Sequence, residues 1–135
     1  MKKNGFYALI YILFPLVIII FVISSFFTPI EMSIEKEQIT LSVPQCSTTI
    51  LKYKNISDVK MCTDFDIGKK DKGVNDGKYY AGYFSNEEYK SYFAFIHCNV
   101  NEYIIIKIKD DTYVINDTSI EKTENLYQTI IMNSK

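Results

Sequence analysis

The sequence predicts an N-terminal transmembrane α-helix followed by one α+β, mainly β domain. We expect this domain to be a curved antiparallel sheet or partly open barrel of about seven strands, capped by one C-terminal helix. Three observations support this prediction. An uncharged, mostly apolar run fills residues 6–27. Short stretches with alternating polar and apolar residues follow as far as Asn116, as in strands. The end of the chain then changes to helical spacing.

The apolar run over residues 6–27 is long enough to cross a membrane. At about 1.5 Å per residue its helix measures roughly 33 Å, against a hydrocarbon core of about 30 Å. Lys2 and Lys3 precede the run and mainly acidic residues follow it, so the positive-inside rule predicts a cytoplasmic N-terminus. We therefore expect a single-pass, signal-anchored protein of the bacterial plasma membrane. Residues 1–28 hold the basic N-terminus and the span, and residues 29–135 form an extracytoplasmic domain.

Two other interpretations of the N-terminus remain open. A cleaved signal peptide would share the basic start and the apolar stretch, with Ser24 and Ser25 as small residues, although this stretch exceeds the usual ~7–15 residues. Residues 2–6, Lys-Lys-Asn-Gly-Phe, resemble the start of type IV prepilins, which are cleaved between Gly and Phe. That family usually carries glutamate at the fifth mature position, where this chain has Ile10. A pilin-like assembly subunit is therefore the least favoured alternative.

The domain contains a series of predicted strands. The first two alternate with period two across a short polar turn and are expected to form a hairpin. Residues 64–78 are rich in Gly, Asp, Lys and Asn, so we expect a long exposed loop there. Asp110-Asp111 is expected to be a tight turn. The expected strands are 32–36, 39–43, 48–52, 56–62, 79–84, 89–98, 103–109 and 112–116.

The chain ends in a predicted helix of about 14 residues. Thr118 and Glu121 have the spacing of a capping box, in which each side chain accepts a backbone N–H from the other residue. Apolar side chains then recur at helical spacing, so one face of the helix is expected to pack against the sheet. These side chains are Ile120, Leu126, Tyr127, Ile130 and Ile131.

Four segments of the domain follow an order found in a known family: Gly82-Tyr83-Phe84, residues 92–96, residues 103–116 and Leu126-Tyr127. They resemble segments of the bacterial pleckstrin-homology (PH) domains of small membrane proteins. That family has a G-x-F segment, a strand, a hairpin of the form I-x-I-x-T-x-D-G-x-Y-V-I-N, and a helix with Leu-Tyr. Asp111 replaces the usual turn glycine. The resemblance covers roughly residues 34–131 and implies a PH-like fold rather than a function.

The charges disfavour several partners. All 15 basic residues are lysine, a composition typical of proteins from AT-rich bacterial genomes. The chain therefore has no arginine guanidinium group to bind a phosphate or carboxylate through two hydrogen bonds. From Glu31 onward, 13 lysines face 16 acids, which makes nucleic acid and anionic lipid poor partners. Phosphoinositide binding is not supported either, because residues 35–38 of the first hairpin loop are Glu-Lys-Glu-Gln. The candidate partner or ligand loop carries Lys69, Lys70, Lys72 and Lys78, interleaved with aspartates.

The sequence shows no catalytic or metal-binding pattern, and we expect no enzyme activity and no cofactor. His97 and Cys98 are adjacent, so in a strand they point to opposite faces and do not readily serve one site. The three cysteines lack C-x-x-C spacing. Cys62 and Cys98 are the pair expected if a disulfide forms, and all three thiols could instead stay reduced.

We therefore expect a non-enzymatic, membrane-anchored module for protein interaction or self-assembly at the cell envelope. Edge strands and the groove between sheet and helix suit docking of a peptide or subunit. The alternative is a ligand-binding sensor or an accessory subunit of a membrane transporter or envelope enzyme, with a tyrosine-lined pocket at the mouth of the barrel. The tyrosines considered for that pocket are Tyr79, Tyr80, Tyr83, Tyr89 and Tyr92.

Overall fold

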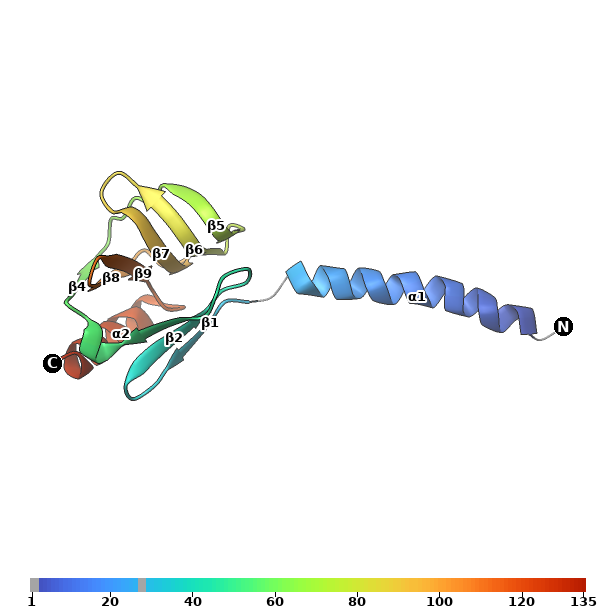
Figure 1. Ribbon diagram of the computed structural model, residues 1–135, viewed down its shortest axis with the longest axis horizontal. Helices are drawn as coiled ribbons and strands as arrows, with labels where there is room; N and C mark the ends of the chain where they lie inside the picture. The colour runs from blue at the N-terminus through green and yellow to red at the C-terminus, as the bar shows by residue number, and fades with distance from the viewer. Residues whose placement is uncertain (1–2, 27–28) are drawn as a thin grey trace.

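The computed structural model describes residues 3–26 and 29–135, and the side chains of residues 9–24 and 29–135. Figure 1 shows α1 extending away from the part of the chain that holds the strands and α2. The elements are α1 Lys3–Phe26, β1 Glu31–Ile34, β2 Gln38–Ser42, β3 Thr49–Lys52, the 3₁₀ turn η1 Tyr53–Asn55, β4 Asp58–Cys62, β5 Lys69–Asn75, β6 Tyr79–Asn86, β7 Lys90–His97, β8 Tyr103–Ile108, β9 Asp111–Ile115 and α2 Ile120–Asn133.

The predicted transmembrane span coincides with α1, whose described side chains run from Leu9 to Ser24. Among the residues that the structure describes, no helix has both the length and the apolar character needed to cross a bilayer. On this finding the predictions of a transmembrane helix and of a single-pass plasma-membrane location are wrong. Lys2 and the predicted boundary at residue 28 lie outside the described residues.

The described strands form two sheets, so the prediction of one curved antiparallel sheet or partly open barrel is also wrong. The order is β1-β2-β3 in the first sheet and β4-β8-β9-β7-β6-β5 in the second. The second sheet is mixed, because β9 pairs antiparallel with β8 on one side and parallel with β7 on the other. It is not closed, since β4 and β5 are its two edges. Periodicity cannot predict this arrangement, because alternation does not encode strand direction.

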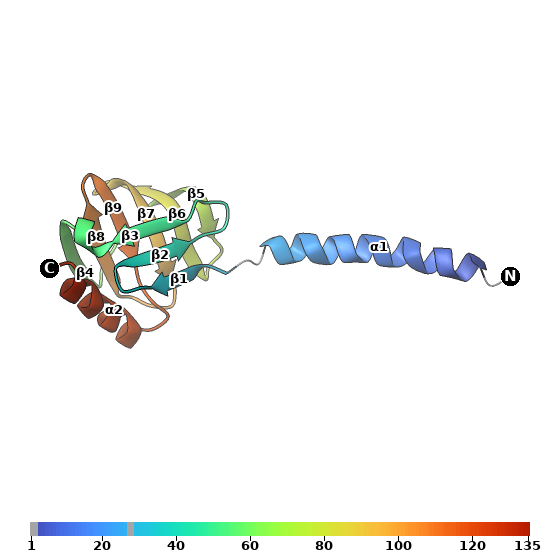
Figure 2. The same ribbon diagram turned by 60° about the horizontal axis from the view of Figure 1, so that its bottom comes forward.

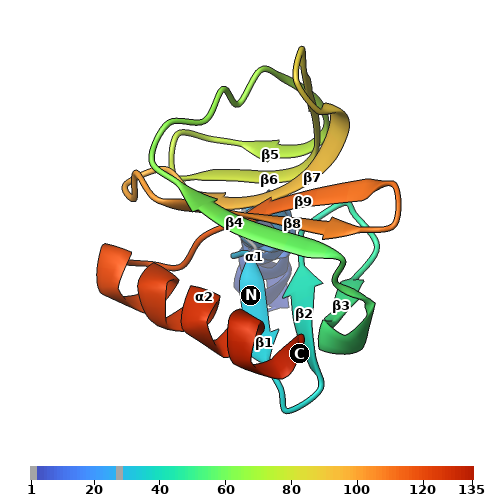
Figure 3. The same ribbon diagram turned by 90° about the vertical axis from the view of Figure 1, so that its left-hand side faces the viewer.

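The main core lies between the two sheets and α2. The three-stranded sheet crosses one face of the six-stranded sheet in Figure 2, and α2 lies along one side of both in Figure 3. Alternation points every second side chain of a strand toward this core, which is why Ile39 and Leu41 of β2 and Ile104 and Ile106 of β8 are fully buried in it. The buried core residues include Ile39, Leu41, Leu51, Tyr53, Phe95, Ile104, Ile106, Ile115, Leu126 and Ile130.

A second, smaller core covers the opposite face of the six-stranded sheet. The chain from β4 to β5 joins the two edges of this sheet and packs Phe65 and Ile67 onto that face (Figure 3). The ring centroids of Phe65 and Tyr92 are 5.3 Å apart, and the Tyr92 hydroxyl donates to the Ile67 carbonyl at 2.6 Å. The prediction of a long exposed loop over residues 64–78 is therefore wrong. Phe65 and Ile67 pack against the sheet, and residues 69–75 form β5.

The C-terminal helix is present, but its cap differs from the prediction. The Ser119 hydroxyl accepts the Lys122 N–H at 3.2 Å, so Ser119 rather than Thr118 is the N-cap. The buried Thr123 hydroxyl donates to the Ser119 carbonyl at 2.8 Å and accepts the Asp117 N–H at 3.0 Å. These bonds fix the direction in which the chain leaves β9 and enters α2.

Candidate binding pocket

The four lysines of the predicted partner loop do not form one cluster. Lys69, Lys70 and Lys72 lie on the exposed edge strand β5, and Lys78 lies in the turn to β6. The register shifts between Lys70 and Lys72, because Asp71 is an extra residue in β5. Lysines and a bulge on an edge strand hinder pairing with other chains. The geometry of β5 thus gives these lysines a protective role in the sheet.

The predicted disulfide partners lie near the same end of the six-stranded sheet. Cys62 ends β4 and Cys98 follows β7, and both thiols act electrostatically on Tyr103, whose pKa is raised mainly by burial. Burial also raises the pKa of both thiols, which disfavours the nucleophilic thiolate. All three cysteines are free thiols in the structure, so the Cys62–Cys98 bridge stays a prediction.

His97 belongs to a hydrogen-bond network around a fully buried asparagine. The His97 N–H donates to Oδ1 of Asn116 at 2.7 Å. The Asn116 amide in turn donates to the carbonyls of His97 at 3.2 Å and Val100 at 3.1 Å. Because these bonds satisfy a side chain with no exposed surface, the network fastens the end of β7 to the end of β9.

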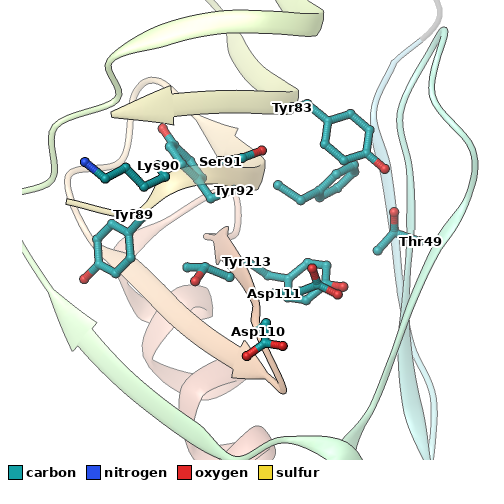
Figure 4. Close-up of a pocket in the computed structure, with 11 residues that line it drawn as sticks. Thr49, Tyr83, Tyr89, Lys90, Ser91, Tyr92, Asp110, Asp111 and Tyr113 are labelled. Atoms are coloured by element: carbon teal, nitrogen blue, oxygen red, sulfur yellow. The ribbon is translucent and has the colours of Figure 1, made fainter. Parts of the chain in front are cut away.

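The pocket with the most concentrated chemistry lies where β3, β6, β7 and the β8–β9 turn meet. We call it the Tyr83 pocket, and its volume is about 510 Å³. In Figure 4, Tyr83, Thr49, Asp111 and Tyr113 lie around one space, whereas Tyr89 and Lys90 lie on the opposite side of the view. Its lining residues are Thr49, Tyr83, Tyr89, Lys90, Ser91, Tyr92, Phe93, Asp110, Asp111, Thr112 and Tyr113.

Strand pairing builds a row of three rings across this pocket. Tyr83 on β6 lies opposite Phe93 on β7, and Phe93 lies opposite Tyr113 on β9. The ring centroids of Tyr83 and Phe93 are 5.3 Å apart, and those of Phe93 and Tyr113 are 6.3 Å apart. Phe93 is 3% exposed whereas Tyr83 is 43% exposed, so the row runs from the main core out to solvent.

The β8–β9 turn brings negative charge to the same place. Lys109 adopts a left-handed φ of 55°, and the following Asp110 and Asp111 line the pocket. Burial, followed by the charge of Asp111 and by Tyr83, raises the pKa of the Tyr113 phenol. Among the described residues, neither aspartate side chain makes a hydrogen bond or an ion pair. The pocket therefore combines aromatic surface with unpaired carboxylates.

The sequence partly predicted this pocket. Tyr83, Tyr89 and Tyr92 line it, as the ligand-binding alternative required. Tyr79 instead contacts His97 at a centroid distance of 5.4 Å, and Tyr80 contacts Phe84 at 6.0 Å. The lining residues that were missed are Thr49, Lys90, Ser91, Phe93, Asp110, Asp111, Thr112 and Tyr113. For Phe93 and Tyr113 the missing signal was the parallel pairing of β7 with β9.

The Tyr83 pocket offers groups that can bind a ligand. Its phenols, hydroxyls and carboxylates can accept hydrogen bonds, and its rings offer flat apolar surface. Within the described part of the chain, no three His, Cys, Asp or Glu side chains lie together as metal ligands would.

Comparison of the chain with family models, with curated proteins and with solved structures gives no significant match. The resemblance to bacterial PH domains therefore stays a hypothesis.

Proposed function

We propose that residues 29–135 form a non-enzymatic binding module that recognises a protein partner at the Tyr83 pocket. The observation that carries this proposal is the row of Tyr83, Phe93 and Tyr113, which ends at a solvent-exposed ring. Tyrosine is enriched at protein interfaces, because it adds a large apolar surface and a polar hydroxyl with few rotatable bonds. A partner side chain inserted against such a row would act as an anchor.

A second candidate function is binding of a free small molecule in the same pocket. The volume of about 510 Å³ supports it, since ligand pockets usually measure roughly 300–1,000 Å³. The phenols of Tyr83 and Tyr113 and the carboxylates of Asp110 and Asp111 also provide the few convergent polar groups that orient a ligand. This candidate corresponds to a sensor or an accessory subunit.

The proposal is tested by selecting random peptides on the immobilised full-length chain. A nonionic detergent is needed, because α1 exposes large apolar side chains along Leu9–Ile23. We expect enriched peptides whose affinity falls at least tenfold in Tyr83→Ala and in Tyr113→Ala, measured by titration calorimetry. Ile50→Ala is the matched control, because Ile50 is 51% exposed on β3 and does not line the pocket.

Enriched peptides that bind Tyr83→Ala and Tyr113→Ala as tightly as the wild type would overturn the proposal. Failure to enrich any peptide would also overturn it. A small-molecule screen with the same variants then tests the second candidate. Circular dichroism and denaturation of each variant separate a lost contact from a lost fold.

A further inference from the structure

The aromatic row of the Tyr83 pocket favours a positively charged ligand. The Tyr83 and Phe93 rings meet edge to face with an interplanar angle of 83°, and Phe93 and Tyr113 are inclined by 53°. The rings therefore present differently oriented surfaces to one space. The face of an aromatic ring carries negative potential and attracts a cation within about 6 Å of its centroid. Tyr83 and Tyr113, with the buried Phe93 between them, thus form a wall suited to a cation.

Two carboxylates add formal negative charge at the mouth of the same pocket. Asp110 and Asp111 are exposed on the β8–β9 turn, and Figure 4 shows both beside Tyr113. The influence of Asp111 on the phenol of Tyr113 places this charge beside the aromatic wall. In the part of the chain that the structure describes, no lysine forms an ion pair with either side chain. An incoming cation would therefore find both carboxylates free.

Lys90 is the one basic residue that lines the pocket among the described residues. Its side chain points away from Tyr83 and Asp111, with the ammonium nitrogen on the opposite side of the view in Figure 4. The ammonium of Lys60 also lies on that side, 5.8 Å from the ring centroid of Tyr89. The side of the pocket formed by Tyr83, Tyr113 and the two aspartates therefore has net negative character. An anion would meet repulsion, and a neutral group would leave both carboxylates without a partner.

We propose that the Tyr83 pocket binds an alkylammonium group, supplied either by a lysine side chain of a protein partner or by a free amine. This inference rests on the proposed function, because it names the chemistry that the same pocket recognises. The aromatic row contacts the alkyl chain and the carbons next to nitrogen, and Asp110 and Asp111 neutralise the charge. Lysine combines an apolar four-carbon stem with a charged end, which matches an aromatic surface flanked by carboxylates.

The experiment titrates the ¹⁵N-labelled full-length chain, in nonionic detergent, with three probes of equal length: n-butylamine, n-butanol and butyrate. We expect n-butylamine to shift the amide signals of residues 83, 111 and 113, with a Kd at least tenfold below that of n-butanol. Butyrate should leave those signals unchanged. The double variant Asp110→Asn/Asp111→Asn should raise the Kd for n-butylamine at least fivefold.

The matched control is Asp58→Asn/Asp71→Asn, which removes the same net charge from exposed positions on β4 and β5 outside the pocket. Its Kd for n-butylamine should equal that of the wild type. Equal affinity for n-butylamine and n-butanol, or equal loss in both double variants, would overturn the alkylammonium inference. If the enriched peptides still require Tyr83 and Tyr113, the proposed function stands without the alkylammonium inference. If the peptides do not require these residues either, both proposals are overturned.

The source of the ammonium group is separated by one further titration. A pentapeptide with a central lysine and blocked ends is compared with n-butylamine on the same chain. A Kd for the peptide at least tenfold below that of n-butylamine identifies a lysine of a protein partner. Equal Kd values identify a free amine. Either result is consistent with the alkylammonium site, provided that the double variant Asp110→Asn/Asp111→Asn weakens both probes.

Discussion

At the scale of single residues, buried tyrosines link stability to pH. Tyr92 is 2% exposed, and its hydroxyl donates to the Ile67 carbonyl. Burial, followed by the charge of Asp66, raises the pKa of Tyr92 far above its usual range. Burial also raises the pKa of Tyr103 and of Tyr113. In the unfolded chain these phenols ionise near pH 10. Their contribution to stability is therefore complete below about pH 10 and is lost as pH rises through the folded-state values.

We predict that the guanidinium midpoint of unfolding falls above about pH 10 and that Tyr92→Phe reduces this fall. At pH 7 the variant loses one hydrogen bond, which lowers the free energy of unfolding by about 1 kcal/mol. It also removes the phenol that resists ionisation most. Denaturation curves between pH 7 and pH 11.5 measure both effects. Lysines titrate in the same range in both proteins, so the comparison isolates Tyr92. Identical pH dependence in wild type and variant would contradict the assignment.

At the scale of elements, the pairing of β5 with β6 depends on two facing glycines. Gly73 has φ +124° and Gly82 has φ +116°, and the register places them opposite each other. A Cβ on Gly82 would overlap the Lys72 carbonyl oxygen and lie 2.9 Å from the Gly73 Cα atom. Both contacts are with backbone, so no side-chain rotation relieves them. These glycines let the edge strand lie close against the strand that carries Tyr83.

Gly82→Ala should therefore destabilise the protein by about 3 kcal/mol or more, because the strain of an unfavourable φ and a backbone clash add together. Gly77→Ala is the matched control. Gly77 also has a positive φ, of +83°, but a Cβ there meets nothing within 4 Å. We expect Gly77→Ala to cost only about 1 kcal/mol. Urea denaturation of both variants measures the difference, and equal losses would rule out the backbone clash.

Elements also show what could be read from the sequence and what could not. Periodicity placed α2, and alternation placed most strands, because each pattern is local. The capping box was placed one residue too early, since Thr118 and Ser119 are both good caps, and the local bonds of Lys122 and Thr123 are made to Ser119. β5 was missed because its residues are lysine, aspartate and glycine, and only pairing with β6 makes them a strand. The pocket was found only in part, because Tyr113 reaches Phe93 through a parallel pairing of distant segments.

At the scale of the whole molecule, both cores are built from residues of the C-terminal part of the chain. The buried members of the two clusters lie between Ile30 and Ile130. They include residues from both sheets and from α2, and the partly buried Phe65 and Ile67 of the segment between β4 and β5 pack against the second cluster. No α1 residue belongs to either cluster among the described side chains. We therefore expect the stability of the domain to depend on α2 and not on α1.

We predict that removal of residues 1–28 changes the free energy of unfolding by less than about 0.5 kcal/mol, because none of the described side chains of that segment, residues 9–24, belongs to a buried cluster. Removal of residues 120–135 should instead prevent cooperative unfolding, because Leu126 and Ile130 are 2% and 0% exposed and their loss uncovers the main core. Each such side chain contributes about 1.5–3 kcal/mol when buried, and a small domain has only about 5–15 kcal/mol in total. Urea denaturation followed by circular dichroism measures all three chains. A loss above about 2 kcal/mol in the first truncation would mean that α1 packs against the domain, and cooperative unfolding of the second would mean that the two sheets form a sufficient core without α2.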